Sequence, residues 1–213
     1  MAGAGPCTLY KPLSREGGEG VSPPSEGLSA GTISITGTVE TITLQESHER
    51  GGVKYRPSAR VANPPFVHGA TIRVEASGGA DVRAFTISVV APPELIGFAP
   101  PRSLTRSGYT ATWSPDSGTA IEIVIGASSS RTSEDGAILL CRVPDTGTYS
   151  VPASTLALFP PSFDEALVNV SRVADTVSIL GNARITLEAT TLVGSSEPIP
   201  FAPLAPDNPT PVP

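Results

Sequence analysis

The segments YTATWS (109–114), IEIVI (121–125) and ILLC (138–141) are followed by GTYSVPASTLALFP (147–160). The first two alternate apolar and polar residues with a period of two, which is typical of half-buried β-strands. Polar turns separate the segments, and a single Trp in a strand is typical of the core of a β-sandwich. The stretch from 109 to 160 therefore predicts half of a β-sandwich and argues against a helical or nucleotide-binding protein.

Similar patterns extend over most of the chain. Short apolar runs are bounded by Gly, Pro, Asp and Ser, which favour turns. The run PASTLALF (152–159) is the one helix-like segment, and it ends at two prolines. Candidate strands lie at 32–36, 39–44, 53–55, 71–75, 84–90, 95–98, 109–114, 120–126, 137–143, 166–174 and 183–193.

These patterns predict an all-β protein with two immunoglobulin-like antiparallel β-sandwich units, at 29–92 and 93–194, or one larger sandwich. Residues 1–28 are expected to form a flexible leader, since REGGEGVSPPSEG (15–27) has almost no apolar side chain to bury. Residues 195–213 form a Pro-rich tail that favours extended polyproline II. Phe201 and Leu204 are candidate anchors if the tail lies as a strap on the domain.

Composition narrows the classes of partner. The chain has 14 Lys and Arg against 20 Asp and Glu, a net charge of −6. Nucleic-acid binding depends on clustered basic residues that release counterions, and here they are scattered. No apolar run approaches the roughly 20 residues of a membrane-spanning helix. We therefore expect no nucleic-acid partner and no transmembrane segment.

The sequence leaves two alternatives for the cellular compartment of the protein. The abundance of Thr, Ser, Gly and Pro and the two lysines suggest an extracytoplasmic protein. The first residues, MAGAGPCTLYK, lack the charged and apolar regions of a signal peptide. A mature secreted form and a cytosolic protein both remain open.

The two cysteines also leave alternatives. A disulfide between Cys7 and Cys141 would close a long loop and stabilise the fold by several kcal/mol in the chain-entropy model. Alternatively, Cys141 is a buried thiol in a strand and Cys7 is incidental. A third reading makes Cys7 a lipid-attachment site, although Pro6 before it departs from the usual small-residue box.

Catalytic and metal motifs are weak. The chain has no G-x-S-x-G elbow, and its histidines, His48 and His68, have no evident nucleophile beside them. Calcium needs only loop oxygens, and acidic turn residues are present, but Asp is also a common turn former. We expect no enzyme activity, no cofactor and no metal site of defined ligands. The acidic turn residues of the second half are Asp116, Glu134, Asp135 and Asp145.

Several motifs carry a resemblance to a known group. These are TATW (110–113), IEIVI, LLCRV (139–143) and VPASTLALFP (151–160), with GTISITG (31–37) and the segment 66–92 upstream. In them the chain resembles predicted secreted or surface β-proteins of predatory and social soil bacteria, of the myxobacterial type. The resemblance implies a secreted or surface location and brings no catalytic residues. The segment HERGGVKYRPSAR (48–60) departs from the group and marks where binding would differ.

We therefore predict a non-enzymatic extracytoplasmic binding or structural module at the bacterial cell surface. It would meet a protein or glycan partner through the loops at 48–65 and 128–136, because binding residues concentrate on loops of rigid scaffolds. One alternative is a carbohydrate-binding module, with or without the assistance of calcium, that uses Tyr10, Tyr55, Tyr109 or Tyr149 as a platform. Another is a subunit of a filament or coat that assembles through its termini. The candidate binding residues are His48, Arg50, Lys54, Tyr55, Arg56, Arg131, Glu134 and Asp135.

Overall fold

The computed structural model describes residues 2–10, 27–49, 52–130, 132–181 and 183–202. It is an all-β structure with one short helix, α1 (Ala153–Leu156), which confirms the predicted class. The strands are β1 (Ala2–Ala4), β2 (Cys7–Tyr10), β3 (Ile33–Thr36), β4 (Ile42–Glu49), β5 (Gly52–Pro57), β6 (Thr71–Ala76), β7 (Phe85–Val90), β8 (Leu104–Thr105), β9 (Gly108–Thr112), β10 (Ala120–Ser129), β11 (Thr132–Pro144), β12 (Thr148–Pro152), β13 (Glu165–Leu180), β14 (Ala183–Gly194) and β15 (Ile199–Ala202).

The chain forms two compact units. Unit 1 comprises residues 1–15, 95–172 and 192–213, and unit 2 comprises residues 16–94 and 173–191. The long strands β13 and β14 therefore each contribute one part to unit 1 and the other to unit 2. Residues 173–191, expected within the second sandwich, cluster instead with the N-terminal sheet.

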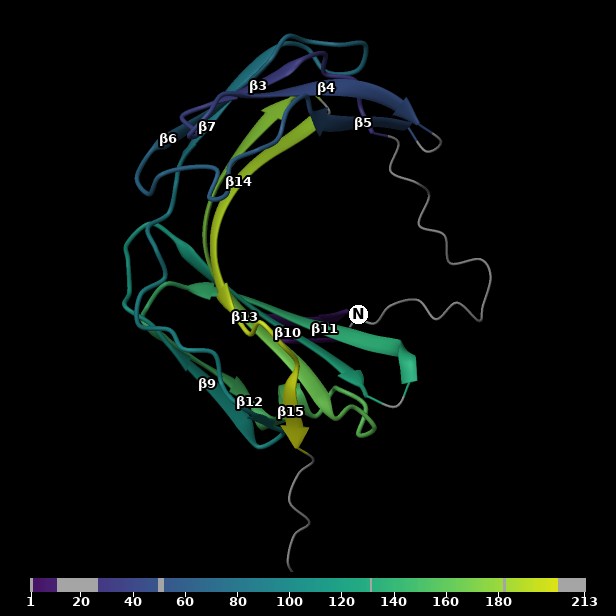
Figure 1. The fold of residues 1–213 in the computed structure, drawn as a ribbon, viewed down its shortest axis with the longest axis vertical. Helices are drawn as coiled ribbons and strands as arrows, with labels where there is room; N and C mark the ends of the chain where they lie inside the picture. Colours follow the sequence, from purple (N-terminus) through teal and green to yellow (C-terminus); the bar gives the residue numbers. More distant parts are fainter. Residues whose placement is uncertain (1, 11–26, 50–51, 131, 182, 203–213) are drawn as a thin grey trace, which may run out of the picture. The chain divides into compact units, whose positions relative to one another are not determined.

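A curled, mixed sheet makes up most of unit 1, in the order β1-β2-β11-β10-β13-β15-β8 (Figure 1). The register of β10 on β11 places Ile121, Ile123 and Ile125 opposite three apolar residues of β11, and all three isoleucines are fully buried. Val168 and Val170 of β13 join the same core. Each such side chain contributes roughly 1.5–3 kcal/mol on burial, so this row is a large stabilising contribution within unit 1.

A separate antiparallel pair, β9 with β12, belongs to the same unit. Trp113 directly follows β9, is 5% exposed and lies in the core cluster, as the sequence predicts. The helix is shorter than the expected range 152–159, because residue 152 pairs with β9 as the end of β12 and residues 157–159 form a turn and bend.

The Pro-rich segment adds a strand to this unit. β15 pairs antiparallel with β13 and parallel with β8, and Phe201 is 1% exposed, which confirms it as an anchor. Its ring lies edge-on to Phe159, with centroids 5.6 Å apart. Leu204, the other candidate anchor, lies outside the described residues.

Arg106 holds this region together. Its guanidinium carbon lies 4.3 Å from the centroid of the Phe201 ring, a cation–π contact. Its nitrogens donate to four backbone carbonyls, and the residue is 5% exposed. Burial lowers the pKa of this guanidinium. The acceptors are the carbonyls of Leu156, Phe159, Pro160 and Phe163, at 3.4, 2.9, 2.6 and 3.1 Å.

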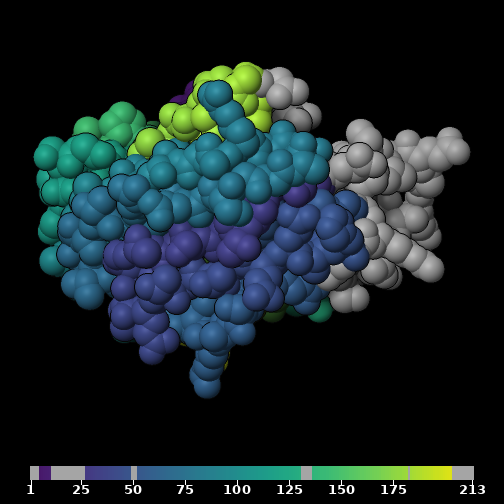
Figure 2. All heavy atoms as spheres, turned by 90° about the horizontal axis from the view of Figure 1, so that it is seen from above, coloured from purple at the N-terminus to yellow at the C-terminus, as the bar shows by residue number. Residues whose placement is uncertain are grey.

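Unit 2 contains the sheet β5-β4-β3-β6-β7, whose outer face is seen in Figure 2. On β6, Ile72 and Val74 alternate with exposed residues, as a strand with one buried face requires. Two core clusters join this sheet to residues of β13 and β14: Ala183 lies in one and Ala189 in the other. The connection after β6 needs Gly79, because a Cβ there would collide with Ser29 and the backbone of Gly31.

Several finer expectations are wrong. Residues 2–10, expected in a flexible leader, form β1 and β2, and Cys7 and Leu9 are buried. Residues 95–98 form no strand. The segment 128–136, expected as a loop, mostly continues β10 and β11. A curled sheet with one parallel pair is not clearly immunoglobulin-like.

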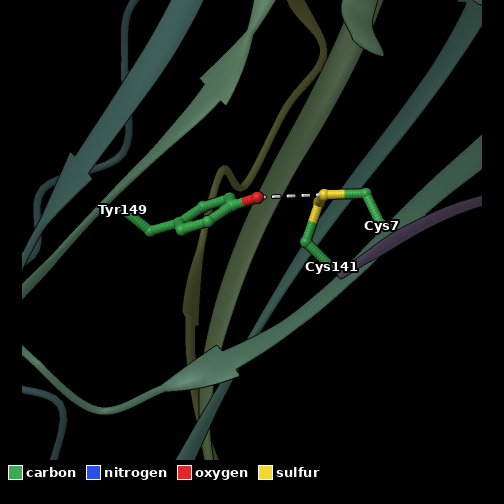
Figure 3. Close-up of a disulfide and its surroundings, with 3 residues drawn as sticks. All are labelled: Cys7, Cys141 and Tyr149. Atoms are coloured by element: carbon green, nitrogen blue, oxygen red, sulfur yellow. Dashed lines mark hydrogen bonds between the residues drawn. A yellow bond between two sulfur atoms is a disulfide. The ribbon is translucent and has the colours of Figure 1, made fainter. Parts of the chain in front are cut away.

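A disulfide joins Cys7 to Cys141, as one of the sequence-based alternatives predicts (Figure 3). The two residues are direct partners in the register of β2 on β11, and both are buried. The hydroxyl of Tyr149 lies 3.5 Å from Cys7 Sγ. The bond leaves Cys7 and Cys141 no thiol, so neither lipidation of Cys7 nor a reduced Cys141 applies to this structure.

Removal of the disulfide should destabilise the protein. The bond links residues 134 positions apart, so the chain-entropy model predicts that Cys7→Ala with Cys141→Ala lowers the free energy of unfolding by about 5 kcal/mol. Urea denaturation with and without reductant measures this. Reductant should weaken only the wild type, and equal stability of both proteins would contradict the prediction.

Substitution of Arg106 should also destabilise the protein. Arg106→Met keeps an apolar stem over Phe201 but leaves buried carbonyls without donors, which should cost about 3 kcal/mol. Arg102→Met, at an exposed position, is the matched control and should change stability little. Denaturation curves of the two variants check this, and equal midpoints would show that the carbonyls find other donors.

Candidate functional site

The predicted residues of the first candidate loop lie on a hairpin formed by β4 and β5. The register pairs Glu46 with Tyr55 and Ser47 with Lys54. Residues opposite one another in an antiparallel pair share a face of the sheet. Tyr55 therefore lies on the face of Glu46, whereas Lys54 and Arg56 lie on the other face and are exposed. The expected loop at 48–65 is a loop only in part. The predicted strand at 53–55 lies within β5, and residues 58–65 form no strand, but His48 and Glu49 still belong to β4.

Glu46 is the centre of a polar cluster on this hairpin. Its Oε2 accepts hydrogen bonds from the hydroxyls of Ser29 and Tyr55, at 2.8 and 3.2 Å. Its Oε1 lies 2.9 Å from Nε2 of His48. The His48 side chain is 77% exposed, against 19% for Glu46. The structure thus brings together His48 and Tyr55, two of the predicted binding residues, around an acid that the sequence analysis missed.

The same cluster fixes the segment before β3. The amide of Ser29 donates to Asp81 at 2.7 Å, and the amide of Ala30 donates to the Tyr55 hydroxyl at 2.7 Å. The amide of Ala80 donates to Ser29 Oγ at 3.3 Å. These residues come from four places in the sequence, so no local motif could have identified the cluster.

The electrostatics of the cluster keep Tyr55 protonated. Burial raises the pKa of the Tyr55 hydroxyl, the amide of Ala30 lowers it, and the neighbouring Glu46 and Asp81 raise it further. The net pKa lies above the ordinary value of 10.0. A neutral hydroxyl can donate to Glu46 while accepting from Ala30, which is the geometry observed.

This arrangement is suited to holding the backbone rather than to nucleophilic attack. A hydrolytic triad places His between the nucleophile and the acid, whereas here Glu46 lies between Ser29 and His48. Ser29 is 8% exposed, and its hydroxyl is already bonded to Glu46 and Ala80. His48 presents a polar group of this cluster broadly to solvent, and Asp81 is the other exposed member.

Other predicted site residues are not assembled with this cluster. Arg50 and Arg131 lie outside the described residues. Glu134 and Asp135 fall within β11, but their side chains also lie outside what the structure describes. For all four, a binding role stays a prediction.

A shallow hollow lies where β10 and β11 approach the second candidate loop. Its volume is about 270 Å³, and its lining includes Gly126, Gly136, Ile138 and Leu167. Ile138 is 49% and Leu167 38% exposed. A Cβ at Gly126 would meet nothing within 4 Å, so the glycine leaves the sheet surface open. The sequence analysis did not identify this hollow, because its residues look like ordinary strand positions.

The tyrosines do not form a common platform. Tyr109 and Tyr149 pack against the core of unit 1, and burial raises the pKa of Tyr109 to about 12. Tyr55 is engaged with Glu46, and Tyr10, 43% exposed, is the one open tyrosine among the described residues. Over the same residues, no three His, Cys, Asp or Glu side chains are close enough to hold a metal ion.

Asp145, one of the acids considered for calcium, takes part in a buried ion pair. It accepts from Arg172 Nε at 2.7 Å, from Trp113 Nε1 at 2.6 Å and from Thr119 Oγ1 at 2.8 Å. Arg172 also donates to the carbonyl of Ser114 at 2.5 Å. Burial raises the pKa of Asp145, but these hydrogen bonds outweigh it and hold the pKa below 3.8. The carboxylate therefore joins the Trp113 loop to β13.

Comparisons with known proteins identify no relative: no family model, no curated protein and no solved structure matches the chain. Among the described residues, no helix is long and apolar enough to cross a membrane.

The buried ion pair predicts a specific acid dependence. Because the folded pKa of Asp145 lies below its unfolded value, its contribution to stability is present above pH 4 or so and is lost as the pH falls through the folded pKa. Asp145→Asn should cost about 3 kcal/mol at neutral pH and flatten the loss of stability below pH 4. Urea unfolding across this pH range checks it, with Asp116→Asn as control. An unchanged acid profile in Asp145→Asn would contradict the assignment.

Proposed function

We propose that this chain is a non-enzymatic extracytoplasmic module at the bacterial cell surface, where it binds a partner or contributes to a structure. The observation that carries the proposal is the buried Cys7–Cys141 disulfide. Disulfides persist in oxidising compartments and are rare in the cytosol. The resemblance to secreted and surface β-proteins of the myxobacterial type agrees with this location.

The non-enzymatic part of the proposal rests on how the buried polar groups are used. Ser29, Glu46 and Asp145 are each engaged in holding neighbouring segments in place. Arg106 binds carbonyls in the same manner. Groups with the chemistry for acid–base or nucleophilic work thus have structural partners. Lys54 and Arg56 are exposed on the outer face of one hairpin, where each can meet a binding partner in addition to its contacts within the chain.

Location is tested in the cells that produce the protein. Thiol alkylation followed by mass measurement, with protease added to intact cells, should show an oxidised pair and an accessible chain. A chain confined to the cytosol with two reduced thiols would overturn the proposal. A chain found in the periplasm would support the proposed extracytoplasmic location but contradict the proposed location at the cell surface.

Binding is tested with the hairpin. Lys54→Glu with Arg56→Glu reverses both outer-face cations, and we expect at least a tenfold loss of binding of the labelled protein to isolated envelopes of the producing bacterium. The matched control is Arg102→Glu with Arg184→Glu, which changes the net charge equally at two other exposed positions. If both variants lose binding equally, the effect comes from overall charge. If the hairpin variant loses no binding, the hairpin is not the binding surface.

A further inference from the structure

The two edges of the unit 2 sheet differ. β7 is an end strand, and β6 is its one strand partner in the described part of the chain. Its sequence, FTISVV, has no charged residue and no proline. Four of its six residues are β-branched, which favours strand pairing. β7 therefore offers a regular, uncharged edge for the pairing of another strand.

The opposite edge strand, β5, is protected against pairing with another chain. Gly27 forms a bridge with Gly52 on this strand, and the amide of Val53 donates to the Gly27 carbonyl at 3.3 Å. β5 also carries Lys54 and Arg56 and ends at Pro57, which has no N–H to donate. Charges, prolines and covering segments are the usual means of keeping an edge strand from pairing with another chain. β7 has none of them within its bounds.

We propose that β7 pairs antiparallel with β7 of a second copy of this chain and joins the two sheets into one. A second copy is the favoured occupant because an uncharged strand meets its own copy without like-charge repulsion. Growth beyond two copies through β5 is blocked by its covering segment and proline. The contact is therefore isologous and closes as a two-fold dimer.

The burial pattern restricts the register of this pairing. Phe85, Ile87 and Val89 lie toward the core, and Thr86, Ser88 and Val90 lie outward. Opposite residues share a face, so the registers that pair most of β7 and also keep the core side chains of both copies together are those centred on Ile87 or on Ser88. In both registers Ser88 faces an outward residue of the partner, either Thr86 or Ser88 itself. Val90, 57% exposed, would then lie against the second copy.

This inference goes beyond the proposed function, because it concerns a second copy and does not depend on cellular location. It differs from assembly through the chain termini, since β7, at residues 85–90, lies far from both ends of the sequence. Within the described residues, the terminal strands β2 and β15 already pair inside their own chain.

The test is sedimentation equilibrium of the full chain from low micromolar to near-millimolar concentration. The wild type should form a dimer and no larger species. Thr86→Lys with Ser88→Lys places like charges opposite one another in both registers and should raise the dimer dissociation constant at least tenfold. Thr186→Lys with Thr190→Lys, at exposed positions of β14, adds the same charge and should leave it unchanged.

A charge swap makes the test specific to this edge. Thr86→Glu with Ser88→Glu should also be monomeric, and mixing it with the lysine variant should restore a dimer that contains one copy of each. Hydrogen exchange of the wild type should show amides of 85–90 becoming protected as concentration rises, which requires no variant. A wild type that stays monomeric, or a dimer that the lysine variant and hydrogen exchange leave unaffected, would overturn the proposal.

Discussion

Burial of one row of side chains on β10, β11 and β13 is the interaction on which unit 1 depends. Ile121, Ile123 and Ile125 face the apolar row of β11 and are excluded from water. A shift of one residue in this register would turn every one of these side chains to the outer face. The disulfide lies within this arrangement, because Cys141 is opposite Ile123 on one side and opposite Cys7 on the other.

Buried polar residues complete both units in the same way. Arg106, Asp145 and Glu46 each bind two or more segments that lie far apart in the sequence. Burying such a group is costly unless its hydrogen bonds are made. Because each group is bonded only when its segments are correctly placed, these clusters favour one arrangement of the loops over others.

The edge strands of the two units differ in how far they are paired or protected. In unit 1, β15 is paired on both sides, and the Pro-rich segment that contains it covers part of β13. In unit 2, β5 is covered near Gly52 and carries charges, whereas β7 keeps a plain hydrogen-bonding edge. An exposed edge of this composition is a hazard for a protein that works as a monomer. In this sheet β7 is open to pairing while the opposite edge strand, β5, is protected. This difference is the physical basis for inferring that β7 pairs with a defined partner.

The alternation of apolar residues by itself determined the all-β class, most strand positions and the burial of Trp113, because a half-buried strand leaves a period of two in its residues. Phe201 is predicted as an anchor on a different basis, as an apolar side chain of the Pro-rich tail. Only the tertiary structure decided that β1 and β2 join the main sheet, that β13 and β14 run through both units, and that Glu46 binds Ser29, Tyr55 and His48. Such contacts join residues distant in sequence. Periodicity reports which side chains are buried but carries no information about which strand or polar partner they meet.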